Sequence, residues 1–252
     1  MSAPAPAVQP GGTLTYDIIG GDSQLLQVVL AAGEEILCCK DRFIFCGAGV
    51  KLSPDTQAGW GLLALLKTIG PEGEFAPRKW SNTGTRPAYI GIGTAFTGKI
   101  IPFDLSVAGP IVIASDNFVA CSAQATIAAK RYSLGRSGSM VMRRIGGAGT
   151  CFIHAGGAAV EKQLHAMEVM FVDSCCLVGF TESCGYSSEV SGAMAAMFGG
   201  NRLAYNCKIT GPGTVWVQSM SLTETSGRLW ASGRRGTADL RRQMMVGIGV
   251  VG

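Results

Sequence analysis

The hydrophobic positions of this chain fall into short runs, which either alternate with polar residues or are wholly apolar, and turn residues separate the runs. Runs of this length predict β-strands joined by tight turns. Their spacing predicts an all-β protein with antiparallel sheets, in a sandwich or barrel-like fold. The predicted strands are 13–19, 25–30, 36–39, 43–46, 88–92, 98–105, 111–114, 118–122, 151–154, 158–164, 168–172, 175–180 and 215–218.

One phrase recurs along the chain, a Gly-Thr pair that leads into an apolar run. The pairs begin at Gly84, Gly149 and Gly213, so the spacings are 65 and 64 residues. Asp116–Ala120 also resembles Asp173–Leu177. A phrase that returns at a nearly constant spacing indicates internal repetition. We therefore expect three repeats of about 65 residues each.

The segments that lead into the Gly-Thr turns differ most between the repeats. Segments 59–70 and 191–200 are apolar, whereas 129–138 is polar and basic. Insertions of this kind tend to gather at one end of a repeat protein and to carry its function. We expect either packing on the sheet or one patch that contacts a membrane or a partner, formed by Leu62, Leu63, Leu65, Leu66, Met194, Met197 and Phe198.

The bulk composition supports an exposed apolar contact. The chain has 252 residues, of which 47% are hydrophobic and only 15% charged, and its mean hydropathy is +0.29. A typical globular protein has about a quarter charged residues. Few charges and a positive hydropathy suggest that apolar surface remains exposed, at a subunit or membrane contact.

We divide the chain into a disordered lead-in at 1–12, a repeat-built β domain at 13–222 and a basic, glycine-containing tail at 223–252. No basic residue precedes Lys40, which argues against a secretory or mitochondrial leader. No apolar run approaches the roughly 20 residues that span a bilayer. The expected location is therefore the cytoplasm.

Residues for catalysis or metal binding are sparse. Nine cysteines occur, but no Cys-x-x-Cys spacing, and the odd count without a signal peptide disfavours a disulfide framework. We interpret these cysteines as buried thiols. His154 and His165 are the only histidines, too few for a cupin-type metal site. We expect no catalytic residue, no metal and no cofactor.

A basic patch offers an alternative function. Its residues surround the second insertion and could contact phosphates: Lys130, Arg131, Arg136, Arg143 and Arg144. The sequence pI is about 8.6, so the excess of positive charge is slight. No aromatic platform for stacking bases accompanies the patch. Nucleic-acid binding is therefore the weaker hypothesis.

The order of several segments resembles the altered inheritance of mitochondria 24 family. The segments are Leu25–Glu34, Ala95–Leu105, Ile111–Ala120 and Gly211–Gln218. The resemblance runs from about Leu14 to Leu222, some four-fifths of the chain. It implies an all-β fold like that of the tryptophan RNA-binding attenuator proteins, built by duplication and often oligomeric.

The family offers no accepted catalytic residues to carry over. Its fungal members are linked to organisation of the mitochondrial inner membrane, and a mitochondrial association rests on this resemblance alone. We expect a non-enzymatic scaffold or adaptor that forms a homo-oligomer and acts at a membrane surface or with a protein partner. The alternative is a ligand- or nucleic-acid-binding module.

Overall fold

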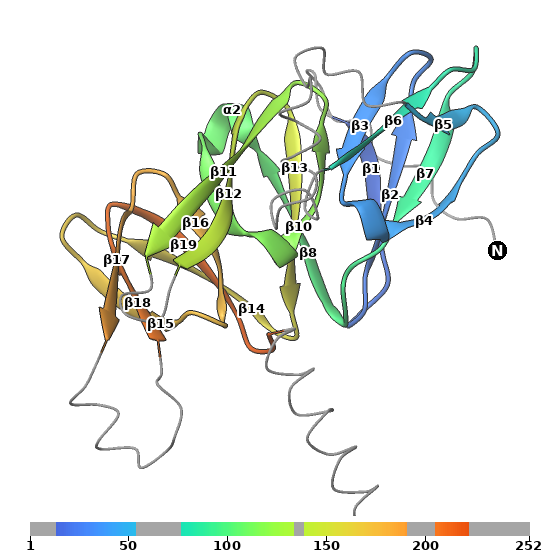
Figure 1. Ribbon diagram of the computed structural model, residues 1–252. Helices are drawn as coiled ribbons and strands as arrows, with labels where there is room; N and C mark the ends of the chain where they lie inside the picture. The colour runs from blue at the N-terminus through green and yellow to red at the C-terminus, as the bar shows by residue number, and fades with distance from the viewer. Residues whose placement is uncertain (1–13, 54–76, 134–138, 191–204, 222–252) are drawn as a thin grey trace, which may run out of the picture.

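The computed structural model describes residues 14–53, 77–133, 139–190 and 205–221, and these form four antiparallel sheets (Figure 1). The predicted all-β class with antiparallel pairing is thereby confirmed. The helical segments among the described residues are short, namely α2 (Leu105–Ala108), η1 (Lys40–Arg42) and η3 (Ser115–Asn117).

The two outer sheets, A and D, are small. Sheet A has the order β1 (Thr15–Ile19), β2 (Leu25–Leu30), β7 (Ala88–Ile92) and β4 (Phe43–Cys46). Sheet D has the order β15 (Val169–Asp173), β18 (Tyr205–Thr210) and β17 (Gly185–Val190).

The two inner sheets, B and C, have six strands each. The order in sheet B is β5 (Val50–Leu52), β6 (Arg78–Asn82), β3 (Glu35–Cys38), β10 (Phe118–Ser122), β13 (Thr150–Gly156) and β8 (Gly98–Asp104). The order in sheet C is β11 (Ala125–Ser133), β12 (Ser139–Gly147), β9 (Ile111–Ala114), β16 (Leu177–Thr181), β19 (Gly213–Gln218) and β14 (Ala159–Leu164).

Three hydrophobic cores hold the four sheets together. Core 1 joins sheets A and B, and includes Leu26 and Phe152. Core 2 joins sheets B and C, and includes Ile113 and Ile153. Core 3 joins sheets C and D, and includes Val112 and Phe180. The inner sheets are thus packed on both faces, which explains why all seven residues of β13 are buried.

Each inner sheet is assembled from two stretches of chain that meet at one strand pair. In sheet B, β3 pairs with β10, and Cys38, Leu37 and Ile36 lie opposite Ala120, Cys121 and Ser122. We call this the first junction. In sheet C, β9 pairs with β16, and Ile113, Val112 and Ile111 lie opposite Gly179, Phe180 and Thr181. We call this the second junction.

The same order of strand pairing occurs three times along the chain. The strands β4, β10 and β16 each pair with the last strand of their own stretch, which is β7, β13 and β19 respectively. Each of these pairs has a register shift at the same place, after Phe43, Phe118 and Leu177. These residues therefore occupy equivalent positions. The predicted repeats of about 65 residues stay a prediction, which this recurrence supports.

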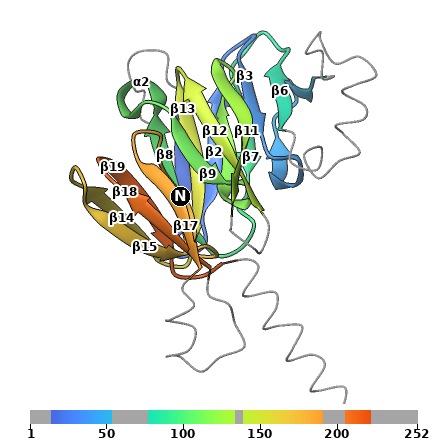
Figure 2. The ribbon, with the colours of Figure 1, turned by 60° about the vertical axis from the view of Figure 1, so that its left-hand side comes forward.

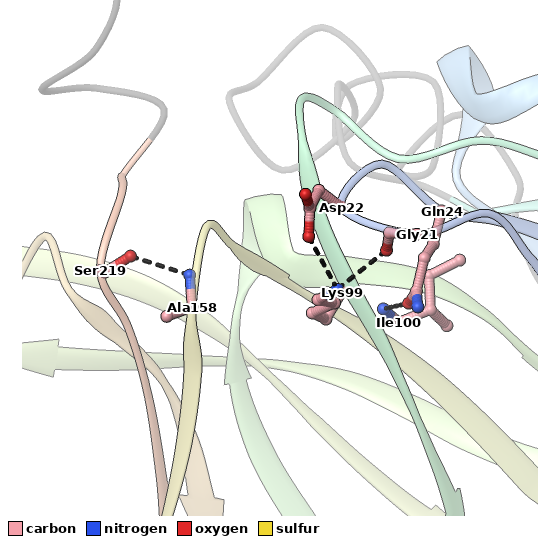
Figure 3. A network of polar contacts seen from close by, with 7 residues as sticks. All are labelled: Gly21, Asp22, Gln24, Lys99, Ile100, Ala158 and Ser219. Carbon is pink, nitrogen blue, oxygen red and sulfur yellow. Dashed lines mark hydrogen bonds and ion pairs between the residues drawn. The ribbon is translucent and has the colours of Figure 1, made fainter.

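Polar contacts attach the turn between β1 and β2 to the edge of sheet B (Figure 3). The Lys99 Nζ donates to the carbonyl of Gly21 at 2.8 Å and approaches Asp22 at 3.3 Å. The backbone N–H of Ile100 donates to Gln24 at 2.7 Å. Because β8 is an edge strand, this turn satisfies a backbone group that would otherwise lack a strand partner.

The runs chosen as strands from the sequence correspond to described strands, with ends that differ by a few residues. Six strands were missed, and they pair as three hairpins: β5–β6, β11–β12 and β17–β18. The three insertions lie within these hairpins or in the chain that connects their strands. Lys130 and Arg131, for example, belong to β11 rather than to a loop.

Candidate functional site

The apolar patch expected from the insertions lies outside the described residues. Leu62, Leu63, Leu65 and Leu66 belong to the segment between β5 and β6, and Met194, Met197 and Phe198 to the segment between β17 and β18. The contact of these side chains with a membrane or partner stays a prediction.

The expected basic patch does not lie on one surface. Lys130 and Arg131 are exposed on β11, and Arg144 is half-buried on β12. Arg143, the neighbour of Arg144 on β12, is only 3% exposed. Arg136 falls outside the described residues. Arg143 therefore does not belong to a surface patch, because neighbours on a strand point to opposite faces.

Arg144 is already paired with a carboxylate of the same chain. Its Nε and one terminal nitrogen donate to the two oxygens of Glu182 at 2.7 and 2.6 Å, a bidentate pair. Lys130 lies 3.8 Å from the same carboxylate. The hydrogen bond from Arg144 holds the pKa of Glu182 below its ordinary value. A phosphate at this place would have to compete with Glu182.

Arg143 packs at the first junction. Its guanidinium lies 4.9 Å from the centre of the Phe118 ring on β10. Burial lowers the pKa of Arg143, while Cys39, Asp116 and Cys121 act to raise it. The charge is thus enclosed between strands from the first two stretches of the chain, where it packs rather than binds a ligand from solution.

The cysteines around this junction are not poised as nucleophiles. Burial raises the pKa of Cys38 and of Cys121 to about 12, and raises that of Cys151 as well. These thiols therefore stay protonated at neutral pH, and the thiolate is the reactive form. Five of the nine cysteines are buried, in line with their interpretation as apolar core residues.

A buried polar cluster connects β13, η3 and β19. The Asn117 side chain donates to the carbonyl of His154 at 2.6 Å and to the Gln218 side-chain oxygen at 2.8 Å. Gln218 also accepts from the backbone N–H of Gly156 at 3.0 Å and donates to the carbonyl of Cys175 at 3.2 Å. These bonds satisfy polar groups between sheets B and C, a structural role.

The His154 ring is the unusual member of this cluster. It is 1% exposed, it contacts Phe96 edge-on at 4.8 Å, and neither ring nitrogen makes a hydrogen bond of good geometry. Burial, with a smaller contribution from Arg42, lowers its pKa to about 4, against a weaker opposing effect of the Phe96 backbone. The ring is therefore neutral at pH 7. Across the part of the chain that the structure describes, no three His, Cys, Asp or Glu side chains gather as metal ligands.

Exposed apolar side chains gather at both ends of the molecule, and sequence reasoning missed them. The N-terminal apolar end consists of Phe43, Ile44, Leu52 and Tyr89. The C-terminal apolar end consists of Met167, Val169 and Phe171. The signal was present in the sequence, because Phe43–Cys46 and Val169–Val172 are apolar at every position. Such runs predict strands that are covered on both faces.

The two ends are built differently. At the N-terminal apolar end, the Phe43 ring stacks on Trp80 of β6 with a centroid separation of 4.4 Å. At the C-terminal apolar end, Phe171 and Val169 project from the same face of β15, and each is roughly half exposed, at 56% and 42%. The described residues include no helix long and apolar enough to cross a membrane.

Comparison with known proteins gives a family and a fold. The family model described as mitochondrial biogenesis AIM24 matches residues 16–220. A crystal structure of a protein from Streptococcus pyogenes is similar, with a TM-score of 0.71 and 16% sequence identity, over 87% of this chain and 99% of that one. At this identity the similarity shows the fold alone. No curated protein matches the sequence.

Proposed function

This chain belongs to the mitochondrial biogenesis AIM24 family, and on that premise we propose that it is a non-enzymatic scaffold or adaptor. It works at a membrane surface or within a membrane-associated assembly, and as a homo-oligomer. The family membership supports a role in organising assemblies. The surface of this chain indicates where its partners would bind.

The observation that carries the proposal is the placement of the exposed apolar side chains. Seven of them lie on β4, β5, β7 and β15 or in the turn before β15. The strands β4 and β7 belong to one outer sheet and β15 to the other, at opposite ends of the stack of sheets (Figures 1 and 2). Contiguous apolar surface on a folded protein marks a contact with a protein or a membrane. A protein with exposed apolar side chains at each end can join two partners, which is what a scaffold does.

The ligand- or nucleic-acid-binding alternative gains little from the described residues. Arg143 is enclosed in the interior, and Arg144 is bound to Glu182. Lys130 and Arg131 remain exposed on β11, but two cations make few phosphate contacts, and affinity for nucleic acid grows with the number of such contacts. The described surface therefore offers few contacts to a nucleic acid.

The membrane part of the proposal predicts binding that depends on the first apolar insertion. Wild-type protein should float with vesicles of phosphatidylcholine and phosphatidylserine, and the double variant Leu65→Asp plus Leu66→Asp should stay at the bottom of the gradient. Removing two apolar side chains and adding two negative charges weakens both the hydrophobic and the electrostatic attraction to an anionic bilayer.

A matched variant separates the loss of the leucines from the added charge. Val107 and Val160 are exposed on α2 and β14, at 84% and 53%, and Val107→Asp plus Val160→Asp adds the same charge elsewhere. This control should float like the wild type, and circular dichroism should show all three proteins folded. If the wild type does not float, or both variants fail equally, the membrane role of the insertion is wrong.

A further inference from the structure

Two strand edges at the opposite ends of the molecule are left without a strand neighbour. Among the described residues, β4 pairs with β7 alone, and β15 pairs with β18 alone. Their other edges carry backbone N–H and C=O groups that none of the described strands satisfies. Both strands are apolar, and an exposed apolar edge is a template for pairing with another chain.

The internal junctions show what normally covers these edges. The repeated pairing order makes β4 equivalent to β10 and β16, and β15 equivalent to β3 and β9. In the first junction β10 lies beside β3, and in the second β16 lies beside β9. A third junction of the same kind would place a β4 beside a β15. Within one chain the two strands lie at opposite ends, so they do not meet (Figure 1).

The exposed side chains on both edges occupy positions that are buried or partly buried at the two junctions. The shared register shifts make Ile44 equivalent to Val119 and Val178. Val119 and Val178 are 1% and 0% exposed, and each packs in the core formed with the preceding stretch of chain. Ile44 is 55% exposed. The described part of its own chain forms no preceding core for Ile44 to enter.

The same holds on the other side. Glu34 and Glu168 occupy equivalent turns, because each side chain accepts from the backbone N–H three residues earlier, which makes Phe171 equivalent to Leu37. Leu37 and Val112 hold the same position at the two junctions, so Phe171 is equivalent to Val112 as well. Val112 is 0% exposed and Leu37 is partly buried, and each packs in the core that follows it. Phe171 is 56% exposed. Each edge therefore lacks one partner strand of a junction. The strand at the other end of a second chain can supply it.

We propose that β15 of one chain pairs antiparallel with β4 of a second copy, in the register of the two internal junctions. This register puts Val172, Phe171 and Met170 opposite Phe45, Cys46 and Gly47 of the second copy. Ile44 of that copy then packs against core 3 of the first. The contact is head-to-tail, so it either closes into a ring of chains or extends into a filament.

This inference rests on the homo-oligomeric scaffold proposed above, and it names the partner and the surface. Burying Ile44 and Phe171 removes two large apolar side chains from water, which favours association. The paired strands also satisfy the open backbone groups of both edges. A second copy is favoured over another protein because the missing surface is the one that this chain builds twice within itself.

A single substitution tests the register, because Cys46 is native. Directly opposed residues in antiparallel strands have Cα atoms about 4.5–5.5 Å apart, within the range that a disulfide spans. Phe171→Cys, oxidised mildly in the otherwise native full-length protein, should give disulfide-linked multimers on a non-reducing gel. Mass spectrometry should find the peptide that links Cys46 to position 171 between two chains.

Two matched variants control for adventitious oxidation, to which the exposed Cys175 is open. Val169→Cys places a thiol on the same face of the same strand, two residues away, where the proposed register offers no cysteine. It should not yield the linked Cys46 peptide. Phe171→Cys combined with Cys46→Ser should lose the multimers. A folded Phe171→Cys protein without the linked peptide, or with the link only within one chain, overturns the proposal.

The mass of the protein in solution, without an engineered disulfide link, provides the second test. Wild-type protein should show the mass of several chains by light scattering, and Ile44→Asp should reduce it to the mass of one chain. Val160→Asp, at a side chain that is equally exposed but lies on β14, should keep the wild-type mass. A monomeric wild type, or an Ile44→Asp protein of unchanged mass, contradicts the proposed contact.

These experiments distinguish a failure of the β4–β15 contact from a failure of the proposed membrane role. If Ile44→Asp is monomeric and still floats with vesicles, both the edge contact and the membrane role stand. If the linked peptide fails to form while wild type floats, the edge contact is wrong and the membrane role stands. If the peptide forms and the wild type does not float, only the membrane role falls.

Discussion

At the scale of single residues, orientation decides what a charged or polar side chain can do. Arg143 and Arg144 are neighbours in the sequence, yet one is enclosed beside Phe118 and the other binds Glu182 at the surface. Sequence reasoning grouped them because it treated the segment as an insertion rather than as a strand. The number of histidines argued against a metal site at His154, but the burial of its ring was not foreseen.

The His154 ring predicts a loss of stability in mild acid. Its folded pKa is about 4, and the unfolded chain takes up the proton near the ordinary value of about 6.5. As the pH falls from 6.5 to 4, the unfolded state therefore gains a proton that the folded state resists, and the free energy of unfolding decreases. Between pH 7 and 4.5 this contribution amounts to about 2–3 kcal/mol.

Urea unfolding at the two pH values measures this effect. His154→Leu should lose less stability than the wild type on acidification, by about that amount, because both proteins share all other titrating groups. Ile153→Val, a change to a neighbouring buried side chain without a titratable group, should keep the wild-type difference. Equal losses for wild type and His154→Leu would show that the ring does not titrate as stated.

At the scale of elements, local patterning located the strands but not their partners. The long apolar or alternating runs predicted β2, β7 and β13, whereas the hairpins that carry the insertions were missed. Their strands, such as β11, mix polar and small residues because their outer faces meet solvent. The Gly-Thr comparison matched β13 with β19, but Gly84 lies in the turn before β7, whose Ala88 corresponds to Gly149.

The likeness of Asp116–Ala120 to Asp173–Leu177 was also placed out of register. The sequence comparison set Phe118 against Cys175. The shared register shift instead aligns Phe118 with Leu177, two residues further along the chain. Sequence identity between two turns was therefore a poor guide to strand register, which side-chain packing on both faces enforces.

Gly179 lies at the second junction, where close packing leaves no room for a side chain. A Cβ there would lie 2.6 Å from the carbonyl oxygen of Val112 and 2.8 Å from a methyl group of Ile113. Gly179→Ala should therefore destabilise the fold by about 1–3 kcal/mol, since backbone on the opposite strand would have to move. Chemical denaturation followed by circular dichroism measures the change.

A glycine on an edge strand, with room for a side chain, serves as the control for this variant. A Cβ at Gly185 of β17 would lie 3.7 Å from the nearest atoms of Thr210, an ordinary contact. Gly185→Ala should change the free energy of unfolding by less than about 1 kcal/mol, in either direction. If the two variants have equal effects, close packing at the second junction is not what selects glycine at position 179.

At the scale of the whole molecule, the sheets are shared between cores. One face of sheet B belongs to core 1 and the other to core 2, and sheet C likewise belongs to cores 2 and 3. No stretch of the chain can leave the structure without opening a six-stranded sheet. The molecule should therefore unfold as one cooperative unit, although its pairing pattern repeats three times.

A cavity in the middle core tests this cooperativity. Ile113 is fully buried in core 2, and Ile113→Ala should lower the free energy of unfolding by about 2–5 kcal/mol. Far-ultraviolet circular dichroism and tryptophan fluorescence should shift together and keep coincident midpoints. Transitions that separate in the variant, or already in the wild type, would mean that the cores unfold independently.

The sequence by itself determined the strand-forming runs, the antiparallel all-β class and the family, because alternation and turn residues act between near neighbours. The tertiary structure decided which strands share a sheet, which face Arg143 occupies, and which apolar edges stay open. Partners such as β3 and β10 are some eighty residues apart, and their pairing depends on packing across both faces of a sheet rather than on local pattern. Among the described residues, β4 and β15 each have one strand partner, because the pairing that recurs inside the chain is continued by no described strand beyond them.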